Sequence, residues 1–333
     1  MQFYDFKEIE ERVILIGVQT EQDEDVAASL DELEELAATA GAVTVGKVIQ
    51  NREAVHPGTY IGKGKIEEVA ALLAAYDANG VICDDELSPA QMNNLERELD
   101  CKVMDRTLLI LDIFAGRATT SEGKIQVELA QLRYRSARLV GLRESLSRLG
   151  GGIGTRGPGE KKLETDRRLI RTRISALKAE LAQVEKHREL IRGKRTRGNL
   201  KTAAIVGYTN AGKSTLLNTL TGAGILAEDK LFATLDPTTR VLELKDGQQI
   251  LLTDTVGFIR KLPHHLVEAF KSTLEEAKYA DYIIHVVDAS NPQAELQMHT
   301  VYETLRELGA TGKKIITLLN KQDQVQGESN CII

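Results

Sequence analysis

The sequence of 333 residues contains no tryptophan, and aromatic residues make up only 4% of it. Stacking on nucleic-acid bases is therefore not an expected mode of binding, because it needs aromatic side chains. The cysteines Cys83, Cys101 and Cys331 form no C-x-x-C pair, which argues against a disulfide framework or a zinc site. No apolar run reaches the length of a membrane span, and the first 11 residues are polar and acidic, unlike a signal peptide. We therefore expect a cytoplasmic protein with no membrane span.

Charge is distributed unevenly along the chain. Residues 131–201 hold 20 Lys and Arg against 7 Asp and Glu, although the whole chain carries 43 basic and 49 acidic side chains. A basic segment within an acidic chain suggests contact with a polyanion. A solvated helical hairpin that is merely basic is the alternative, and nucleic-acid contact is the interpretation that we favour.

Residues 1–120 alternate between apolar strand patterns and amphipathic helical patterns. This alternation predicts a small α/β domain with a parallel sheet. Strands are expected at 13–18, 42–49, 81–83 and 102–104, and helices at 25–40, 66–76, 88–99 and 106–116. The Gly-Lys-Gly-Lys segment at 62–65 either holds phosphate at a helix start or is a turn with surface lysines. The turn is favoured, because the spacing does not complete a phosphate-binding loop.

Residues 121–198 have the pattern of two long helices with apolar residues at spacings of three, four and seven. Such helices are expected to pair as an antiparallel hairpin. The glycine-rich loop between them, 150–159, contains a formal G-x-G-x-x-G, but no strand precedes it and a dinucleotide site is not expected there. The expected domains are therefore 1–120, 121–198 and 199–333, with a linker at 193–198.

The motif G-x-x-x-x-G-K-[ST] of phosphate-binding loops is matched by Gly207, Tyr208, Thr209, Asn210, Ala211, Gly212, Lys213 and Ser214. An apolar strand pattern precedes it and a helical pattern follows, as the motif requires. Backbone N–H groups of the loop would surround a phosphate. Lys213 would reach the β- and γ-phosphates, and Ser214 would bind Mg²⁺. Asn210 leaves two interpretations open, a ligand for K⁺ or a residue that stabilises the loop through its own backbone.

Two further motifs follow strand patterns downstream, and they consist of Asp254, Thr255, Val256 and Gly257, then Asn320, Lys321, Gln322 and Asp323. Asp254 would hold Mg²⁺ through water, and the Gly257 amide could reach the γ-phosphate. The Asp323 carboxylate would accept hydrogen bonds from guanine N1–H and its 2-amino group, a donor pair that adenine lacks.

A third segment lies between the phosphate-binding loop and Asp254, and it consists of Phe232, Ala233, Thr234, Leu235 and Asp236. Thr234 is expected to complete the Mg²⁺ shell, with Thr238 and Thr239 as competitors. Lys213, Thr234 and Gly257 are the expected catalytic residues. The order of the motifs, each at a strand end, predicts a doubly wound GTPase domain.

These motifs resemble the HflX family of translational GTPases, and so do the glycine-rich loop, the basic hairpin and the α/β region before it. The resemblance covers essentially the whole chain. It implies GTP as substrate, Mg²⁺ as cofactor, and binding to the large ribosomal subunit and its rRNA, here through residues 121–198. It further implies a role in ribosome splitting, rescue or biogenesis, for a protein expected to be monomeric. A nucleotide-gated RNA-binding assembly factor, in which hydrolysis is incidental, remains the alternative.

Two features depart from what GTPase domains generally contain. No Ser-Ala motif that would contact guanine follows Asp323 in a chain that ends at Ile333, so we expect the last strand and helix to be missing. Phe258 stands where Ras-like enzymes place a water-orienting Gln. Because a phenyl ring cannot hydrogen-bond water, slow hydrolysis is expected in the absence of a partner.

Overall fold

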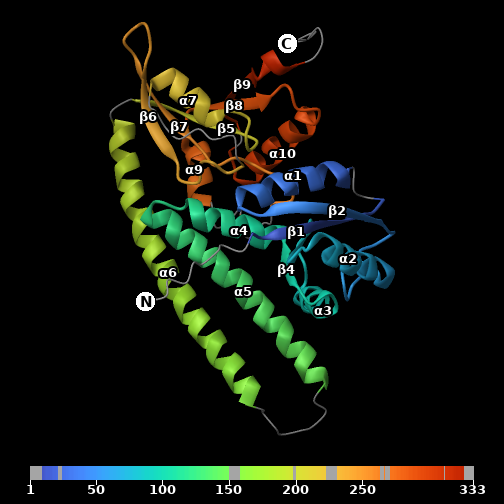
Figure 1. The fold of residues 1–333 in the computed structure, drawn as a ribbon. Coiled ribbons are helices and arrows are strands. Elements are labelled where there is room, and N and C mark those ends of the chain that lie inside the picture. Colours follow the sequence, from blue (N-terminus) through green and yellow to red (C-terminus); the bar gives the residue numbers. More distant parts are fainter. Residues whose placement is uncertain are drawn as a thin grey trace, which may run out of the picture. The chain divides into compact units, whose positions relative to one another are not determined.

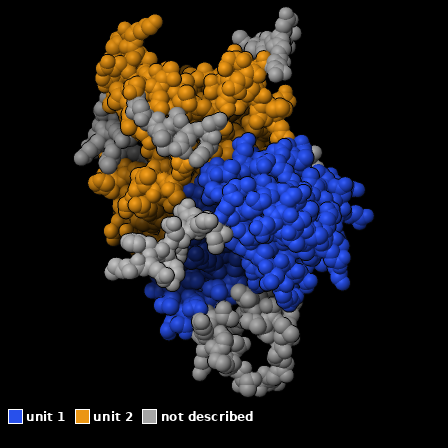
Figure 2. Space-filling view, viewed as in Figure 1, with its two compact units in different colours: residues 1–113, 131–172 blue, residues 114–130, 173–333 orange. Residues whose placement is uncertain are grey.

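The computed structural model describes residues 10–21, 25–149, 158–197, 200–222, 231–262, 266, 271–310 and 312–325. The chain divides into two compact units, residues 1–113 with 131–172 and residues 114–130 with 173–333 (Figure 2). Each unit contains a β-sheet with helices, and the α/β fold class predicted from the sequence is confirmed. The helical hairpin contributes to both units, while the predicted boundaries at 120 and 198 remain predictions.

The first unit contains a four-stranded parallel sheet of order β2-β1-β3-β4. Its elements are β1 (Arg12–Gln19), α1 (Val26–Thr39), β2 (Val43–Asn51), α2 (Lys63–Tyr76), β3 (Gly80–Cys83), α3 (Pro89–Leu99), β4 (Lys102–Asp105) and α4 (Arg106–Arg117). Helix α1 covers one face of the sheet, and α2 and α3 cover the other (Figure 1). Strands alternate with helices because a parallel pair needs a crossover connection.

Burial explains why the strands of this sheet read as continuous apolar runs. All six inner residues of β1 are buried, as expected for a central strand covered on both faces. Ile14 and Ile16 belong to a core that also contains Val69 of α2 and Leu95 of α3. Helix α3 begins with a capping box in which the Ser88 side chain accepts from the Gln91 amide, and Pro89 occupies its first turn.

Charged groups at the carboxyl ends of β3 and β4 form a buried network. Asp84 accepts hydrogen bonds from Ser29 Oγ and Arg106 Nη1, both at 2.8 Å, and Arg106 also pairs with Glu32. Asp84 and Arg106 are at most 1% exposed. Buried ions of this kind are tolerated only when they are paired, and removal of one partner costs about 3–5 kcal/mol. The network therefore fixes α1 and α4 against the sheet.

The hairpin consists of α5 (Ser121–Leu149) and α6 (Pro158–Arg197). Arg173 pairs with Glu128 at 2.7 Å and Arg188 pairs with Glu122 at 3.1 Å. Because the later residue of α6 pairs with the earlier residue of α5, the two helices run antiparallel. Most of the predicted glycine-rich loop, residues 150–157, lies outside the described residues, as do the side chains of residues 140–149 and 158–163.

Buried apolar residues of the hairpin include Ile125, Leu129 and Leu177. Farther along, Tyr134 Oη and Arg138 Nη2 of α5 donate to Asp105 at 2.8 and 2.5 Å. Helix α5 is thus bound to the carboxyl end of β4 through a fully buried carboxylate.

The second unit contains a five-stranded sheet of order β6-β7-β5-β8-β9, in which only β6 is antiparallel. Its elements are β5 (Lys201–Gly207), α7 (Lys213–Thr221), β6 (Thr238–Glu243), β7 (Gln249–Asp254), α9 (Lys271–Tyr279), β8 (Tyr282–Asp288), α10 (Ala294–Glu307), β9 (Lys314–Asn320) and a 3₁₀ turn (Gln322–Gln324). In the parallel pair β5–β7, Ile205 lies opposite Asp254. The segments that follow these two strands therefore meet at one edge of the sheet.

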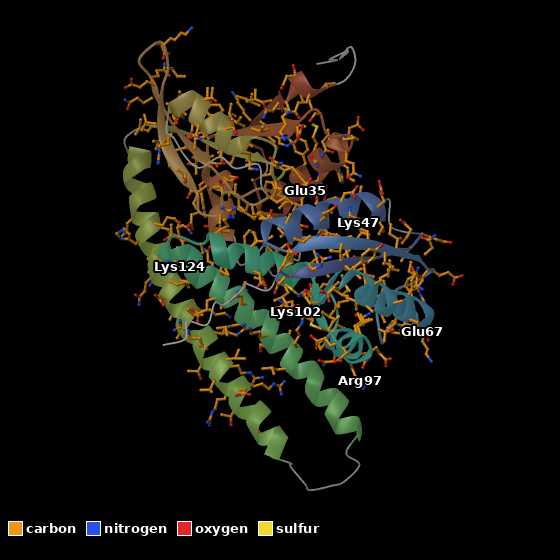
Figure 3. All side chains as sticks on the ribbon, viewed as in Figure 1. Glu35, Lys47, Glu67, Arg97, Lys102 and Lys124 are labelled. Carbon is orange, nitrogen blue, oxygen red and sulfur yellow. The ribbon has the colours of Figure 1, made fainter. Side chains whose placement is uncertain are left out.

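Charged side chains cover the outer surfaces of the helices. Glu35, Glu67 and Arg97 are exposed, whereas Lys47 of β2 pairs with carboxylates of α1, Asp31 and Glu34 (Figure 3).

Among the helices of the described ranges, none is both long and apolar enough to cross a membrane.

Strand β8 carries a histidine whose burial should make the free energy of unfolding depend on pH. His285 is 1% exposed, its Nδ1 has no hydrogen-bond partner among the described residues, and its ring meets Tyr302 edge-on. Burial, with a smaller repulsion from Lys213, lowers the pKa of His285 to about 4, whereas the unfolded chain titrates near the ordinary value of about 6.5. As the pH falls, His285 is therefore protonated in the unfolded chain before it is protonated in the folded protein, and this shifts the equilibrium toward unfolding.

We predict that the free energy of unfolding falls by about 2 kcal/mol from pH 7 to pH 5 because of this residue. Denaturant unfolding at both pH values, on the native chain and on His285→Leu, measures it. The variant should lose this part of the pH dependence, and an equal slope in both proteins would contradict the assignment.

Candidate functional site

The phosphate-binding loop connects β5 to α7. Gly212 precedes the first residue of α7 and has φ +96°, a backbone conformation that residues with a side chain rarely adopt. A Cβ there would also collide with Asn320 Nδ2. Asn210, at φ +59°, tolerates the left-handed region better than most residues do. The turn thus depends on glycine and asparagine at these two positions.

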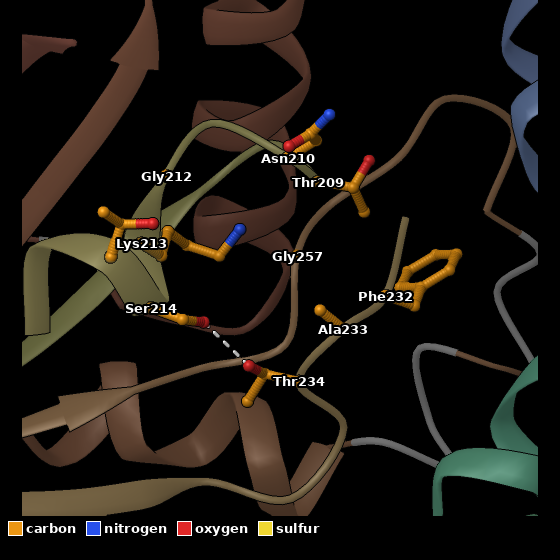
Figure 4. Close-up of a pocket in the computed structure, with 10 residues that line it drawn as sticks. Thr209, Asn210, Gly212, Lys213, Ser214, Phe232, Ala233, Thr234 and Gly257 are labelled. Atoms are coloured by element: carbon orange, nitrogen blue, oxygen red, sulfur yellow. Dashed lines mark hydrogen bonds between the residues drawn. The ribbon is translucent and has the colours of Figure 1, made fainter. Parts of the chain in front are cut away.

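A pocket of about 410 Å³ opens beside this loop (Figure 4). Its lining residues come from the loop, from the 232–234 segment and from the end of the β7 region, and they are Thr209, Asn210, Gly212, Lys213, Ser214, Thr215, Phe232, Ala233, Thr234 and Gly257. Residues separated by more than 40 positions in the sequence therefore surround one space.

Lys213 is the cation of the pocket. Its side chain is buried, and Nζ donates to the Tyr208 carbonyl at 2.6 Å. Burial lowers the pKa of Lys213 to about 8, and Asp254 partly opposes the shift. A buried ammonium group with so little compensation favours the binding of an anion, which is the role predicted for it with the nucleotide phosphates.

Two hydroxyl groups and a carboxylate form a cluster at the floor of the pocket. Ser214 Oγ lies 2.6 Å and Thr234 Oγ1 lies 3.1 Å from Asp254 Oδ2, and the two hydroxyl oxygens are 2.8 Å apart (Figure 4). Burial raises the pKa of Asp254, while Lys213 and the two hydroxyl groups oppose the rise.

The donor chemistry of this cluster fits Mg²⁺. The three contacts among Ser214, Thr234 and Asp254 have only two hydroxyl protons between them, so they cannot all be hydrogen bonds at once. The buried Asp254 Oδ1 has no hydrogen-bond partner among the described residues. Oxygen donors with spare lone pairs are the ligands that Mg²⁺ prefers. Thr238 and Thr239, the competitors of Thr234, lie in β6, where Thr239 Oγ1 contacts Thr253 Oγ1 at 2.9 Å.

Gly257 lies against the phosphate-binding loop. The Phe258 amide donates to the Gly207 carbonyl at 3.1 Å, and the Thr209 amide donates to the Phe258 carbonyl at 2.8 Å. These bonds hold Gly257 so close that a Cβ on it would lie 2.7 Å from Thr209 Cγ2 and 3.0 Å from Lys213 Nζ. Phe258 itself is 1% exposed, so its ring is packed in the protein interior and does not bind water.

The segment after β9 also reaches the loop. Asn320 Nδ2 donates to the Ala211 carbonyl at 2.9 Å, which connects it to the phosphate-binding loop. Lys321 adopts φ +56° and pairs with Asp288 at 2.9 Å. Asp323 is exposed in the following 3₁₀ turn, where a carboxylate is accessible to a base.

The remaining predicted residues lie around the pocket without lining it. Gly207 ends β5 and Tyr208 follows it, and the carbonyl groups of both accept backbone hydrogen bonds. Gln322 is exposed beside Asp323. The buried members of this group are Ala211, Leu235, Thr255 and Val256. Asp236 directs its carboxylate to Thr119 and Thr120. Thr215 lines the pocket but was not predicted, although its position directly after the loop motif could have indicated it.

Comparisons with known proteins find similar GTP-binding proteins. Three family models match the chain, "GTP-binding GTPase N-terminal" over residues 27–115, "GTP-binding GTPase Middle Region" over 117–195 and "50S ribosome-binding GTPase" over 202–321. The GTPase HflX of Lacrimispora saccharolytica is 74% identical over 96% of this chain and 75% of its own length. The GTPase HflX of Caldanaerobacter subterraneus subsp. tengcongensis is 55% identical over 95% of this chain and 73% of its own length.

A solved structure is similar as well. It is the GTP-binding protein of the archaeon Sulfolobus solfataricus in complex with GDP, which is 28% identical over 96% of this chain and 85% of its own length, with a TM-score of 0.51.

The position of Gly257 leads to a test of the pocket. Gly257→Ala would place a methyl group against Thr209 and Lys213 Nζ, where the γ-phosphate is expected to bind. We predict that affinity for a non-hydrolysable GTP analogue falls at least about tenfold relative to GDP, which corresponds to about 1.4 kcal/mol. Titration of both nucleotides measures this ratio. Gly64→Ala, whose Cβ would meet nothing within 4 Å, is the matched control. An unchanged ratio in Gly257→Ala would place the γ-phosphate elsewhere.

Proposed function

Because the chain belongs to the HflX family of GTPases, we propose that this GTP-hydrolysing protein uses its nucleotide state to regulate binding to the large ribosomal subunit. The site residues and their roles are part of this proposal, as are a monomeric state and a cytoplasmic location. Ribosome splitting, rescue or biogenesis is the process in which the protein would act. The proposal rests on the pocket that the phosphate-binding loop lines, with the basic hairpin as support.

The pocket supplies the groups that hydrolysis of GTP needs. Lys213 and the loop amides would stabilise the negative charge that develops on the phosphate oxygens. Ser214 and Thr234 would hold Mg²⁺ directly and Asp254 through water, and the bound ion would neutralise charge between the β- and γ-phosphates. A water oxygen attacks the γ-phosphorus, the bond to the β-phosphate oxygen breaks, and GDP and phosphate leave.

The position directly after Gly257, where Ras-like enzymes place a water-orienting Gln, offers no group that orients the attacking water. Phe258 follows Gly257 but is buried in the protein interior, and its side chain has no hydrogen-bonding atom. Hydrolysis by the isolated protein should therefore be slow, and a group or a rearrangement supplied by the ribosome should accelerate it. Asn210 lines the pocket, a position compatible with either interpretation, a K⁺ ligand or a residue that stabilises the loop through its own backbone.

The hairpin is the surface best suited to RNA. Exposed basic side chains on the described part of α6 include Arg168, Lys178 and Lys186. Such residues bind phosphate groups without reading sequence, and the affinity decreases as salt increases. This agrees with the low content of aromatic residues, 4% of the sequence, because backbone contacts do not require stacking on bases.

A nucleotide-gated RNA-binding assembly factor, in which hydrolysis is incidental, is the competing proposal, and it makes a different prediction about the ribosome. For an enzyme regulated by the ribosome, large subunits raise the rate of turnover. For a factor in which hydrolysis is incidental, they raise only the affinity for GTP.

Charge reversal on α6 tests the proposal. We predict that the native protein sediments with large ribosomal subunits, more with a GTP analogue than with GDP, and that raising the salt from about 50 to 200 mM releases it. Lys178→Glu combined with Lys186→Glu should weaken binding about tenfold or more. Arg97→Glu, on the exposed face of α3, is the matched control and should bind normally. Absence of cosedimentation in GTP, GDP and nucleotide-free states would refute the ribosome proposal.

A further inference from the structure

The segment that carries Thr234 into the pocket also binds the beginning of helix α5. Two residues after Thr234, the Asp236 carboxylate accepts four hydrogen bonds. Oδ2 accepts from the Thr119 amide at 2.9 Å, the Thr119 hydroxyl at 2.7 Å and the Thr120 amide at 2.9 Å, and Oδ1 accepts from the Thr120 hydroxyl at 2.6 Å. Hydrogen bonds to an ionised carboxylate are about twice as strong as neutral ones.

Thr120 is at the same time the residue that caps α5. Its hydroxyl oxygen accepts from the Gly123 amide at 2.9 Å, and its carbonyl accepts from the Lys124 amide at 3.0 Å. These are the bonds of an N-terminal cap. The carboxylate of Asp236 also lies at the positive end of the helix dipole, where a negative charge is favourable. Asp236 therefore holds the cap of α5 in place.

The fit between Asp236 and α5 is tight. A Cβ on Gly123 would collide with Asp236 Oδ1, so the first turn of α5 presents a glycine where the carboxylate approaches. Burial by itself raises the pKa of Asp236, but hydrogen bonds from Thr119 and Thr120 outweigh burial, and the net pKa lies below the ordinary value. The carboxylate is thus ionised at neutral pH, as the four donors require.

The other end of the segment is held as well. Phe232 lines the pocket and is 2% exposed, and its ring meets Phe114 of α4 edge-on with centroids 4.6 Å apart. Its φ of +54° is unfavourable for a bulky residue and persists only where the surroundings hold it. Thr234 thus lies between two anchors, Phe232 on α4 and Asp236 on the start of α5.

We propose that Asp236 is a positioning residue that couples the γ-phosphate to helix α5. The proposal rests on the proposed role of Thr234 in the GTP-bound site. With GTP bound, Thr234 is held at Ser214 and Asp254, and Asp236 remains on Thr119 and Thr120. After loss of the γ-phosphate, Thr234 is released, and Asp236 leaves the start of the helix because two residues of chain span only about 7 Å.

The coupling must act in both directions, because the two equilibria are linked. If the γ-phosphate strengthens the contact between Asp236 and α5, this contact strengthens binding of GTP relative to GDP by the same factor. A partner that holds the start of α5 would likewise raise the affinity for GTP. Residues 119 and 120 thereby become part of the nucleotide switch, although they do not line the pocket.

The test uses the full chain and two readouts. The first is the ratio of affinities for a non-hydrolysable GTP analogue and GDP, and the second is amide hydrogen exchange over residues 119–124 in both states. Asp236→Asn keeps the shape of the side chain but removes its charge. Thr119→Val removes one hydroxyl donor and leaves the cap on Thr120 intact. Glu243→Gln, an exposed carboxylate in β6, is the matched control.

In the native protein, exchange at residues 119–124 should be slower with the GTP analogue than with GDP. Asp236→Asn should remove this difference and weaken the GTP analogue about tenfold while GDP binding stays within twofold. Thr119→Val should show a smaller change in the same direction, and Glu243→Gln should show none. Exchange that is independent of nucleotide in the native protein, or an unchanged affinity ratio in Asp236→Asn, would overturn the coupling.

Thr234→Ala separates this inference from the proposed function. If Thr234→Ala leaves the preference for the GTP analogue intact, the proposed role of Thr234 is wrong and the coupling fails with it. If Thr234→Ala removes the preference but Asp236→Asn does not, the role of Thr234 stands and only the coupling to α5 is refuted.

Discussion

The burial of Lys213 beside Asp254 is the constraint on which the site depends. The ammonium group of Lys213 is removed from water. A hydrogen bond to the Tyr208 carbonyl and the attraction of the Asp254 carboxylate offset part of the cost of its burial. The carboxylate in turn faces two hydroxyl groups that cannot satisfy all its lone pairs. A phosphate and a divalent cation would complete both sets at once. The fold thus keeps a buried cation and a buried carboxylate with unfilled interactions in one site, and binding of nucleotide with its metal ion would fill them.

Helix α5 is the element through which a change in this site would travel. Its beginning is held by Asp236, whose segment also carries Thr234. Farther along the same helix, Tyr134 and Arg138 bind the buried Asp105 at the end of β4. The antiparallel partner α6 carries exposed basic residues, which form the proposed RNA surface.

The sequence alone predicted those parts of the protein whose chemistry is contained in contiguous residues. The phosphate-binding loop and the positions of Asp254 and Asn320 follow from motifs at strand ends, and α3 was predicted because its capping box is local. The contact of Asp236 with Thr119 was not predictable, because it joins residues 117 positions apart and neither belongs to a motif for this contact. The short edge strand β6 was also missed, since its largely exposed sequence shows no apolar alternation.

The proposed function requires that turnover of GTP by this GTPase depends on the large ribosomal subunit. The most direct measurement compares the rate of GTP hydrolysis by the protein alone with the rate in the presence of purified large subunits, with Lys213→Ala as the inactive reference. The protein alone should release phosphate slowly, and the subunits should raise the rate at least about tenfold. Fast hydrolysis by the isolated protein, or a rate that large subunits leave unchanged, would contradict it.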